Sequence, residues 1–168
     1  MKKTYTFLVL ILILSSCQTG TTLTDDQKET AKENISKTLD AWHEAASQAD
    51  FEAYFDLFEG DSAIFMGTDA TERWTVAAFK PWSKPFFDRG RAWSFTAHSR
   101  YITLAEDGMT AWFDEALDTP NMGPCRGSGV MKLTDNGWKI AHYNLSLTVP
   151  NEALNEVKAV IDSLSVSD

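Results

Sequence analysis

Residues 126–149 read RGSGVMKLTDNGWKIAHYNLSLTV, in which two runs containing β-branched and aromatic residues flank the turn Asp135-Asn136-Gly137. An Asn-Gly pair between two such runs is a strong short-range signal for a β-hairpin. We therefore expect antiparallel strands over Arg126–Thr134 and Trp138–Val149. Pro150 ends the second strand because proline has no backbone donor.

Two further runs of the same kind precede this hairpin. They are Ala92–Leu104 and Met109–Asp118, and Glu106-Asp107-Gly108 lies between them as a second turn signal. Together the four runs predict a meander of long antiparallel strands in the second half of the chain.

The first half of the chain has helical periodicity. Thr24 and Gln27 fit a capping box, and Asp25 and Asp26 lie in the first turn, where the helix dipole favours negative charge. Apolar residues then recur every three or four positions, at Ala31, Ile35, Leu39, Trp42, Ala46 and Ala49. This spacing predicts one stripe of a long amphipathic helix.

Shorter elements are expected around these: a helix over residues 51–58 capped by Asp50, a strand over 62–66, a helix over 72–87, and a final helix from Asn151. Pro81 and Pro85 must kink or divide the third helix, because each removes a backbone donor. Helices that are segregated from strands indicate an α+β domain, with the helices packed on one face of a curved sheet.

The N-terminus has the pattern of an export signal. A basic start at Lys2 and Lys3 precedes the apolar run Phe7–Leu14, which is too short to span a bilayer. The tetrapeptide Leu14-Ser15-Ser16-Cys17 then resembles the lipobox of bacterial lipoproteins, in which the cysteine is lipidated and the peptide is cut just before it. An ordinary signal peptide that happens to contain a cysteine is the alternative.

The lipobox resemblance implies three segments: a signal peptide over residues 1–16, a lipidated tether over 17–23 and one domain over 24–168. The protein is then exported and held at the cell envelope by the lipid on Cys17, with its domain outside the cytoplasm. Lipidation of Cys17 leaves Cys125 without a disulfide partner, so we interpret Cys125 as a plain thiol.

The charge of the chain argues against nucleic-acid binding. Loss of Lys2 and Lys3 with the signal leaves 13 basic residues against 24 acidic ones, a net charge of −11. Such a surface repels phosphate backbones and anionic lipid headgroups. We therefore expect no nucleic-acid partner, and contact with the membrane through the lipid anchor alone.

Several segments between residues 28 and 150 resemble the SnoaL-like branch of the nuclear transport factor 2-like superfamily. These segments are the long first helix with Trp42, the restart at Asp50-Phe51-Glu52, Gly67-Thr68-Asp69 before Trp74, Gly108 with Ala111-Trp112-Phe113-Asp114-Glu115, and the closing run Asn136–Ser146. The resemblance implies a cone in which a curled sheet and helices enclose a deep, largely apolar pocket. Relatives include isomerases, cyclases, dehydratases, small-molecule binders and assembly domains, and many dimerise through the outer face of the sheet.

Alternation along the last strand groups Trp138, Ile140, His142, Asn144 and Ser146 on one face, with Lys139, Tyr143, Leu145 and Leu147 on the other. The first group mixes apolar and polar side chains, as ligand pockets do, so His142 and Asn144 are pocket candidates. The alternative is that these two side chains satisfy each other or backbone groups within the sheet.

Asp114 and Glu115 are adjacent, so at most one of them can face the pocket. A carboxylate between apolar walls can serve as a general acid or base. Arg126 begins the next strand and is the expected partner of that carboxylate, either to tune it or as a purely structural ion pair.

On the first long strand we expect His98 and Arg100 on one side, at the mouth of the pocket or facing water. Trp93, Phe95 and Tyr101 are expected on the other side, and Trp74 and Trp93 are interpreted as core or pocket wall. His43, His98 and His142 have no metal-ligand spacing, so no metal site and no cofactor are predicted.

Three functions remain open at this point. The first is an envelope-anchored domain that binds a small apolar molecule in its pocket. The second is an isomerase- or cyclase-type enzyme that uses acid–base residues in the same pocket without a cofactor. The third is an interaction or dimerisation module with no ligand.

Overall fold

A computed structural model describes residues 23–165 and contains one six-stranded sheet with the strand order β2-β1-β6-β5-β4-β3. The strands are β1 (Ile64–Met66), β2 (Arg73–Thr75), β3 (Thr96–Leu104), β4 (Thr110–Thr119), β5 (Gly123–Thr134) and β6 (Gly137–Leu147). The meander β3 to β6 confirms the predicted order of long antiparallel strands. The short strand β1 joins the edge of β6 in parallel, which sequence patterning did not indicate.

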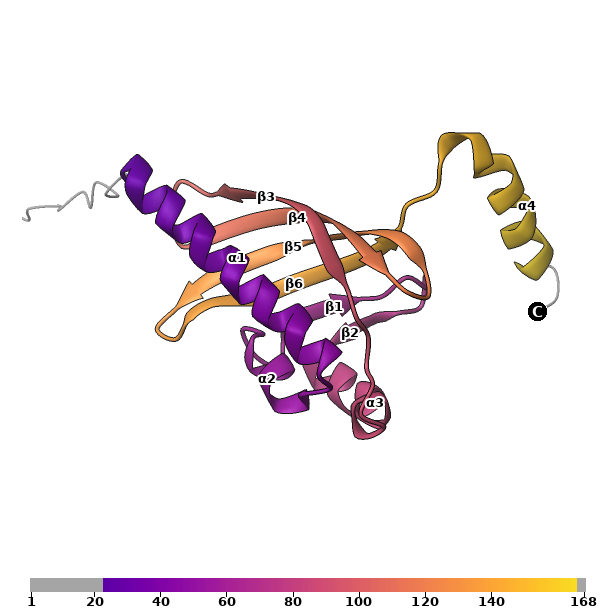
Figure 1. Ribbon diagram of the computed structural model, residues 1–168, viewed down its shortest axis with the longest axis horizontal. Coiled ribbons are helices and arrows are strands. Elements are labelled where there is room, and N and C mark those ends of the chain that lie inside the picture. The colour runs from indigo at the N-terminus through magenta and orange to yellow at the C-terminus, as the bar shows by residue number, and fades with distance from the viewer. Residues whose placement is uncertain (1–22, 166–168) are drawn as a thin grey trace, which may run out of the picture.

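Helix α1 (Asp25–Ser47) lies across one face of the sheet (Figure 1). The capping box predicted at its start is present, since Thr24 and Gln27 each bond the other's backbone N–H. Four members of the predicted stripe are buried, Ile35, Leu39, Trp42 and Ala46, together with His43 and Ala45, whereas the predicted member Ala49 lies beyond the end of the helix. His43 extends this apolar stripe, which gives it the position of a core residue.

Two shorter helices cover the end of the sheet where α1 finishes (Figure 1). Helix α2 (Phe51–Asp56) is capped by Asp50, as predicted. Helix α3 (Val76–Asp88) begins later than expected, because residues 73–75 form β2 and Thr75 caps the helix. Pro81 and Pro85 lie inside α3 without dividing it.

Two bulges change the face on which residues lie. In β6, Ile140 pairs with Met131 and His142 pairs with Val130, so Ala141 has no partner in β5. The extra residue puts Trp138 and Ile140 on the same buried side as Tyr143 and Leu145. Our grouping of His142 and Asn144 with Trp138 and Ile140 is therefore wrong, because a bulge interrupts strict alternation.

The second bulge lies in β3, between Ala97 and Ser99. Ala97 pairs with Leu117 and Arg100 pairs with Glu115, so Ala97 and Arg100 face the helices while His98 does not. The expected placement of His98 beside Arg100 is wrong for the same physical reason.

The space between the helices and the sheet is filled largely by aromatic rings. Trp42 packs on Tyr143 with ring centroids 4.6 Å apart, and Phe65 stacks on Phe79 at 4.1 Å. The interior that the family resemblance implied as a deep pocket thus consists mainly of side chains in contact, and open clefts lie along its rim.

The chain ends in a 3₁₀ turn (Asn151–Ala153) and helix α4 (Leu154–Ser165), which lies apart from the sheet (Figure 1). Leu154, Val160 and Leu164 of α4 are exposed. Among residues 23–165, no helix is both long and apolar enough to cross a membrane. The predicted signal peptide and Cys17 lie outside the described residues.

Candidate functional site

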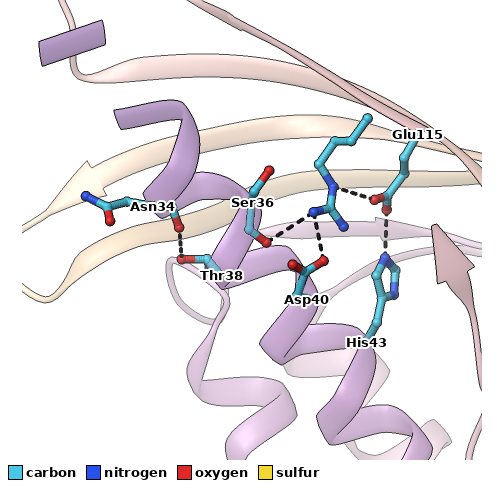
Figure 2. A network of polar contacts seen from close by, with 7 residues as sticks. Asn34, Ser36, Thr38, Asp40, His43 and Glu115 are labelled. Carbon is cyan, nitrogen blue, oxygen red and sulfur yellow. Dashed lines mark hydrogen bonds and ion pairs between the residues drawn. The ribbon is translucent and has the colours of Figure 1, made fainter. Parts of the chain in front are cut away.

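Glu115 is the polar centre of the interior. It lies in the middle of β4 on the face that meets α1, and it is only 1% exposed. One carboxylate oxygen, Oε1, is 2.8 Å from Nε2 of His43, and the other accepts a hydrogen bond of 2.8 Å from Nε of Arg100 (Figure 2). A carboxylate with a guanidinium on one oxygen and an imidazole on the other is a structure in which a proton can be held or moved.

Arg100 connects this carboxylate to helix α1. Its Nη1 donates to the backbone oxygen of Ser36 at 3.1 Å and to Oδ1 of Asp40 at 2.8 Å. The Arg100 and Glu115 side chains are 9% and 0% exposed, whereas the Asp40 side chain is 67% exposed. The buried ion pair therefore lies between helix and sheet, with one solvated carboxylate at its outer end (Figure 2).

Four buried polar atoms of the interior have no hydrogen-bond partner among the described residues: Nε1 of Trp42, the hydroxyls of Tyr54 and Tyr143, and Nη2 of Arg100. The rings that carry the first three are in contact, since Trp42 lies 5.0 Å from Tyr54 and 4.6 Å from Tyr143 between centroids. Most buried polar groups in proteins are paired, so several unpaired ones in one place mark a site where a partner is expected.

The Tyr143 hydroxyl lies close to the Glu115 carboxylate. A Cβ atom on Gly127 would lie 2.5 Å from that hydroxyl and 3.0 Å from Oε1 of Glu115. Glycine at position 127 thus leaves room for both oxygens above β5. A side chain there would displace one or the other.

Both buried tyrosines are held in the neutral form. Burial raises the pKa of Tyr143 well above its usual value near 10, and the negative charge of Glu115 raises it further. Burial also raises the pKa of Tyr54, and Tyr143 adds to this effect. The two phenols are therefore available as hydrogen-bond donors at neutral pH.

Trp93 lies between Tyr54 of this polar cluster and an open cleft. Its ring lies edge-on to Tyr54 with centroids 5.6 Å apart. Trp93 is close enough to lower the pKa of Tyr54 in part, although the Tyr54 hydroxyl has no hydrogen bond of ordinary geometry. Trp93 also lines an open cleft of about 560 Å³ together with Phe86, Arg89, Arg91 and Asn121.

The structure brings two of the predicted site residues together and moves others away. Glu115 and Arg100 form the buried ion pair, so the expectation that Arg126 would partner the carboxylate is wrong. Arg126 is exposed beside Ala116 and Ser146 on the outer face of the sheet.

Asp114 and Asn144 also lie on the outer face, joined through Ser128 in one cross-strand row. Asp114 is exposed, and Asn144 donates to the Ser146 hydroxyl at 3.0 Å. His142 occupies the next row beside Val130 and is half-buried.

His98 is exposed and pairs with Asp118, with Nε2 2.6 Å from Oδ2. Trp74 is half-buried and packs on Trp82 with centroids 4.7 Å apart, so it belongs to the wall formed with α3. Among the predicted aromatic residues, Trp93 is the one that lies between an open cleft and the polar cluster.

Sequence reasoning missed His43, Tyr54 and Tyr143. A signal for His43 was present, because it lies four residues after Leu39 and three before Ala46 and so continues the core stripe. No local signal marks Tyr143, because the bulge at Ala141 decides its face.

Comparisons with known proteins agree on the fold. The sequence profile of the SnoaL-like domain matches residues 35–150. No curated protein matches the sequence.

Three solved structures with low sequence identity share the fold. A candidate aromatic ring hydroxylase from Novosphingobium aromaticivorans is 18% identical, with 73% of this chain and 92% of that chain covered and a TM-score of 0.62. A candidate scytalone dehydratase from the same species is 12% identical, with coverages of 75% and 89% and a TM-score of 0.63. A nuclear transport factor 2-like protein from Pseudomonas putida is 12% identical, with coverages of 75% and 92% and a TM-score of 0.60.

SnoaL-like and nuclear transport factor 2-like domains include ligand-binding and isomerase- or dehydratase-type proteins, and they often form oligomers. The profile match covers well over half of the chain, and the helix packed on a curved, unclosed sheet is the fold of these relatives. The chain therefore belongs to the SnoaL-like domain family.

Proposed function

We propose that this domain binds a small, largely apolar molecule that contains a ring and carries at least one hydrogen-bonding group. The ligand enters at the cleft beside Trp93 and is held against the rings and hydroxyls behind it. Displacement of the Trp93 ring, which lies between the cleft and Tyr54, brings the polar group of the ligand to the atoms of Trp42, Tyr54 and Tyr143 that lack partners in the described residues.

The unpaired polar cluster is the observation that carries this proposal. A buried donor or acceptor without a partner costs about 1–3 kcal/mol. Three such atoms lie on the rings of Trp42, Tyr54 and Tyr143, of which Trp42 contacts both tyrosines. Trp93, which contacts Tyr54, also lines the cleft. Ligand sites typically combine mostly apolar walls with a few convergent polar groups.

The first test is native mass spectrometry of the purified chain for a retained ligand, with variants that remove single hydroxyls. Tyr143→Phe and Tyr54→Phe should lose the retained mass, while Tyr101→Phe should keep it, because Tyr101 is 67% exposed on the outer face. The two interior variants should also raise the ligand-free stability by about 1–3 kcal/mol each, since they remove unpaired buried groups.

Two results count against binding at this site. One is the absence of retained mass together with no melting shift across a panel of ring-containing compounds. The other is a ligand that stays bound with unchanged affinity in Tyr143→Phe and Tyr54→Phe.

A second candidate function is acid–base catalysis on the bound molecule. Its specific support is the 2.8 Å contact between Nε2 of His43 and Oε1 of Glu115 inside an apolar interior. A retained ligand incubated with the protein in D₂O should gain deuterium at a carbon position, and His43→Gln should stop the exchange without releasing the ligand. Equal exchange in both proteins would exclude a role for this pair.

A homodimer through the outer face of the sheet is favoured by the large side chains exposed there. Tyr101 and Trp112 are 67% and 51% exposed on that face, and His142 and Val130 lie in the row of Trp112. Light scattering after size-exclusion chromatography should show a dimer that Trp112→Lys dissociates. Met109→Lys, at an equally exposed turn residue, should leave the dimer intact.

Anchoring at the cell envelope through a lipid on Cys17 is part of the same proposal, supported by the lipobox-like sequence. Radiolabelled palmitate should label the chain in bacterial cells. Cys17→Ala should abolish labelling, and Cys125→Ala, the matched control at the other cysteine, should retain it. Labelling that persists in Cys17→Ala would refute the anchor.

A further inference from the structure

The cleft beside Trp93 has a charge opposite to that of the protein as a whole. The chain carries a net charge of −9, with 24 acidic residues. The lining of this cleft nevertheless contains Arg89 and Arg91 and no carboxylate. Low-dielectric walls lined by one sign of charge concentrate ligands of the other sign.

Neither arginine makes an ion pair in the part of the chain that the structure describes. Asp88, the nearest carboxylate along the chain, is paired with Lys84 instead. Arg89 lies over the ring of Phe86, with its Cζ atom 4.8 Å from the ring centroid. The two guanidinium groups are thus available to a ligand at the cleft.

An aromatic surface adjoins these charges. Phe86 and Trp93 both line the cleft, with ring centroids 6.4 Å apart and planes inclined at 59°. The Trp93 ring also contacts Tyr54, which is buried behind it. A flat ring placed here meets aromatic faces on its way to the unpaired hydroxyls.

The C-terminal ends of two helices at the cleft disfavour the binding of an anion there. Ser47 ends α1 and lines the cleft, and α3 ends at Asp88 just before Arg89. Each helix C-terminus acts as roughly −0.5 of an elementary charge. The two guanidinium groups carry a full positive charge each, so the local balance stays positive.

We propose that the ligand of this cleft is a planar aromatic carboxylate. The carboxylate bonds the guanidinium forks of Arg89 and Arg91, and the ring lies against Trp93 with its far edge toward Tyr54. Arginine suits this role because its planar fork matches the two oxygens of a carboxylate. This inference rests on the proposed binding function and specifies the class of its ligand.

The test compares 1-naphthoate with its neutral isostere 1-naphthamide by isothermal titration calorimetry. The full chain is placed in lipid nanodiscs, with empty nanodiscs as the blank. Naphthoate should bind at least about tenfold more tightly than naphthamide, a difference of about 1.4 kcal/mol. Raising the salt concentration should weaken the binding of naphthoate but not that of naphthamide, because salt screens only interactions between charges.

The variants Arg89→Gln and Arg91→Gln should each reduce naphthoate affinity about tenfold and leave naphthamide unchanged. Arg73→Gln is the matched control, since Arg73 is an exposed arginine of β2 away from the cleft. Trp93→Leu should weaken the binding of both compounds, because it removes the aromatic wall of the cleft.

Three results would overturn the inference. Equal affinity for the two compounds refutes recognition of a carboxylate but leaves the proposed binding function standing. If acetate binds as tightly as naphthoate, recognition of an aromatic ring is refuted. Binding of neither compound, in a protein that retains a native ligand, shows a binding domain whose ligand belongs to another class. Absence of a retained ligand as well removes the proposed function too.

Discussion

Replacing Arg100 by methionine tests the structure of the interior most directly. The substitution keeps a long, flexible side chain but leaves the Glu115 carboxylate, 0% exposed, without its guanidinium. Removing one partner of a buried pair costs about 3–5 kcal/mol, because the remaining charge is uncompensated. A domain of this size has a stability of about 5–15 kcal/mol, so we expect a folded but much weakened protein.

Asp40→Asn is the matched control, because Asp40 is the other carboxylate that binds Arg100 at 2.8 Å. The Asp40 side chain is 67% exposed, and solvent-exposed pairs contribute only about 0–1 kcal/mol. Two contacts of equal length should thus differ several-fold in free energy, for the sole reason that one is buried.

A double variant, Arg100→Met with Glu115→Leu, separates burial of charge from loss of packing. It leaves no unpaired charge, and its remaining penalty is the unpaired His43, about 1–3 kcal/mol. The double variant should therefore be more stable than Arg100→Met alone. Urea unfolding followed by tryptophan fluorescence measures all four proteins. The reasoning fails if Arg100→Met loses less than about 1 kcal/mol or if Asp40→Asn loses as much.

Three further outcomes follow from the same interior. Gly127→Ala should destabilise the domain by about 1–3 kcal/mol in urea unfolding, since its Cβ would lie 2.5 Å from the Tyr143 hydroxyl. The pKa values of Tyr54 and Tyr143 are raised in the folded protein, so the unfolded chain loses these two protons first as the pH rises. The free energy of unfolding should therefore fall as the pH rises above about 10, and unfolding followed by circular dichroism should show a shallower fall in Tyr143→Phe. Cys125 is 2% exposed and burial raises its thiol pKa, so Ellman's reagent should react with it only after unfolding, and rapid reaction of the native protein would contradict the buried site.

The main elements of the fold were predicted correctly because the signals for them are local. The Asn-Gly turn, the capping box at Thr24 and the stripe from Ile35 to Ala46 are each properties of a few neighbouring residues. Each favours one backbone conformation over short distances, and the structure has the predicted helix and hairpin at these places.

The candidate site was harder to predict because two single-residue bulges change which face is buried. Ala141 reverses alternation in β6, so Tyr143 replaces His142 on the interior side. The β3 bulge leaves Arg100 inside and His98 outside. Neither bulge contains a residue that distinguishes it from a regular strand in sequence.

By itself, the sequence determined the order of the long helix and the long strands, the acidic charge, the lipobox-like start and the fact that at most one of two adjacent carboxylates can face the interior. The tertiary structure alone decided that Glu115 is that carboxylate, that Arg100 and His43 are its partners, and that Trp93 separates the polar cluster from the cleft. Periodicity depends on backbone geometry a few residues long, whereas the partner of a side chain depends on strand register and helix packing between residues far apart in the chain.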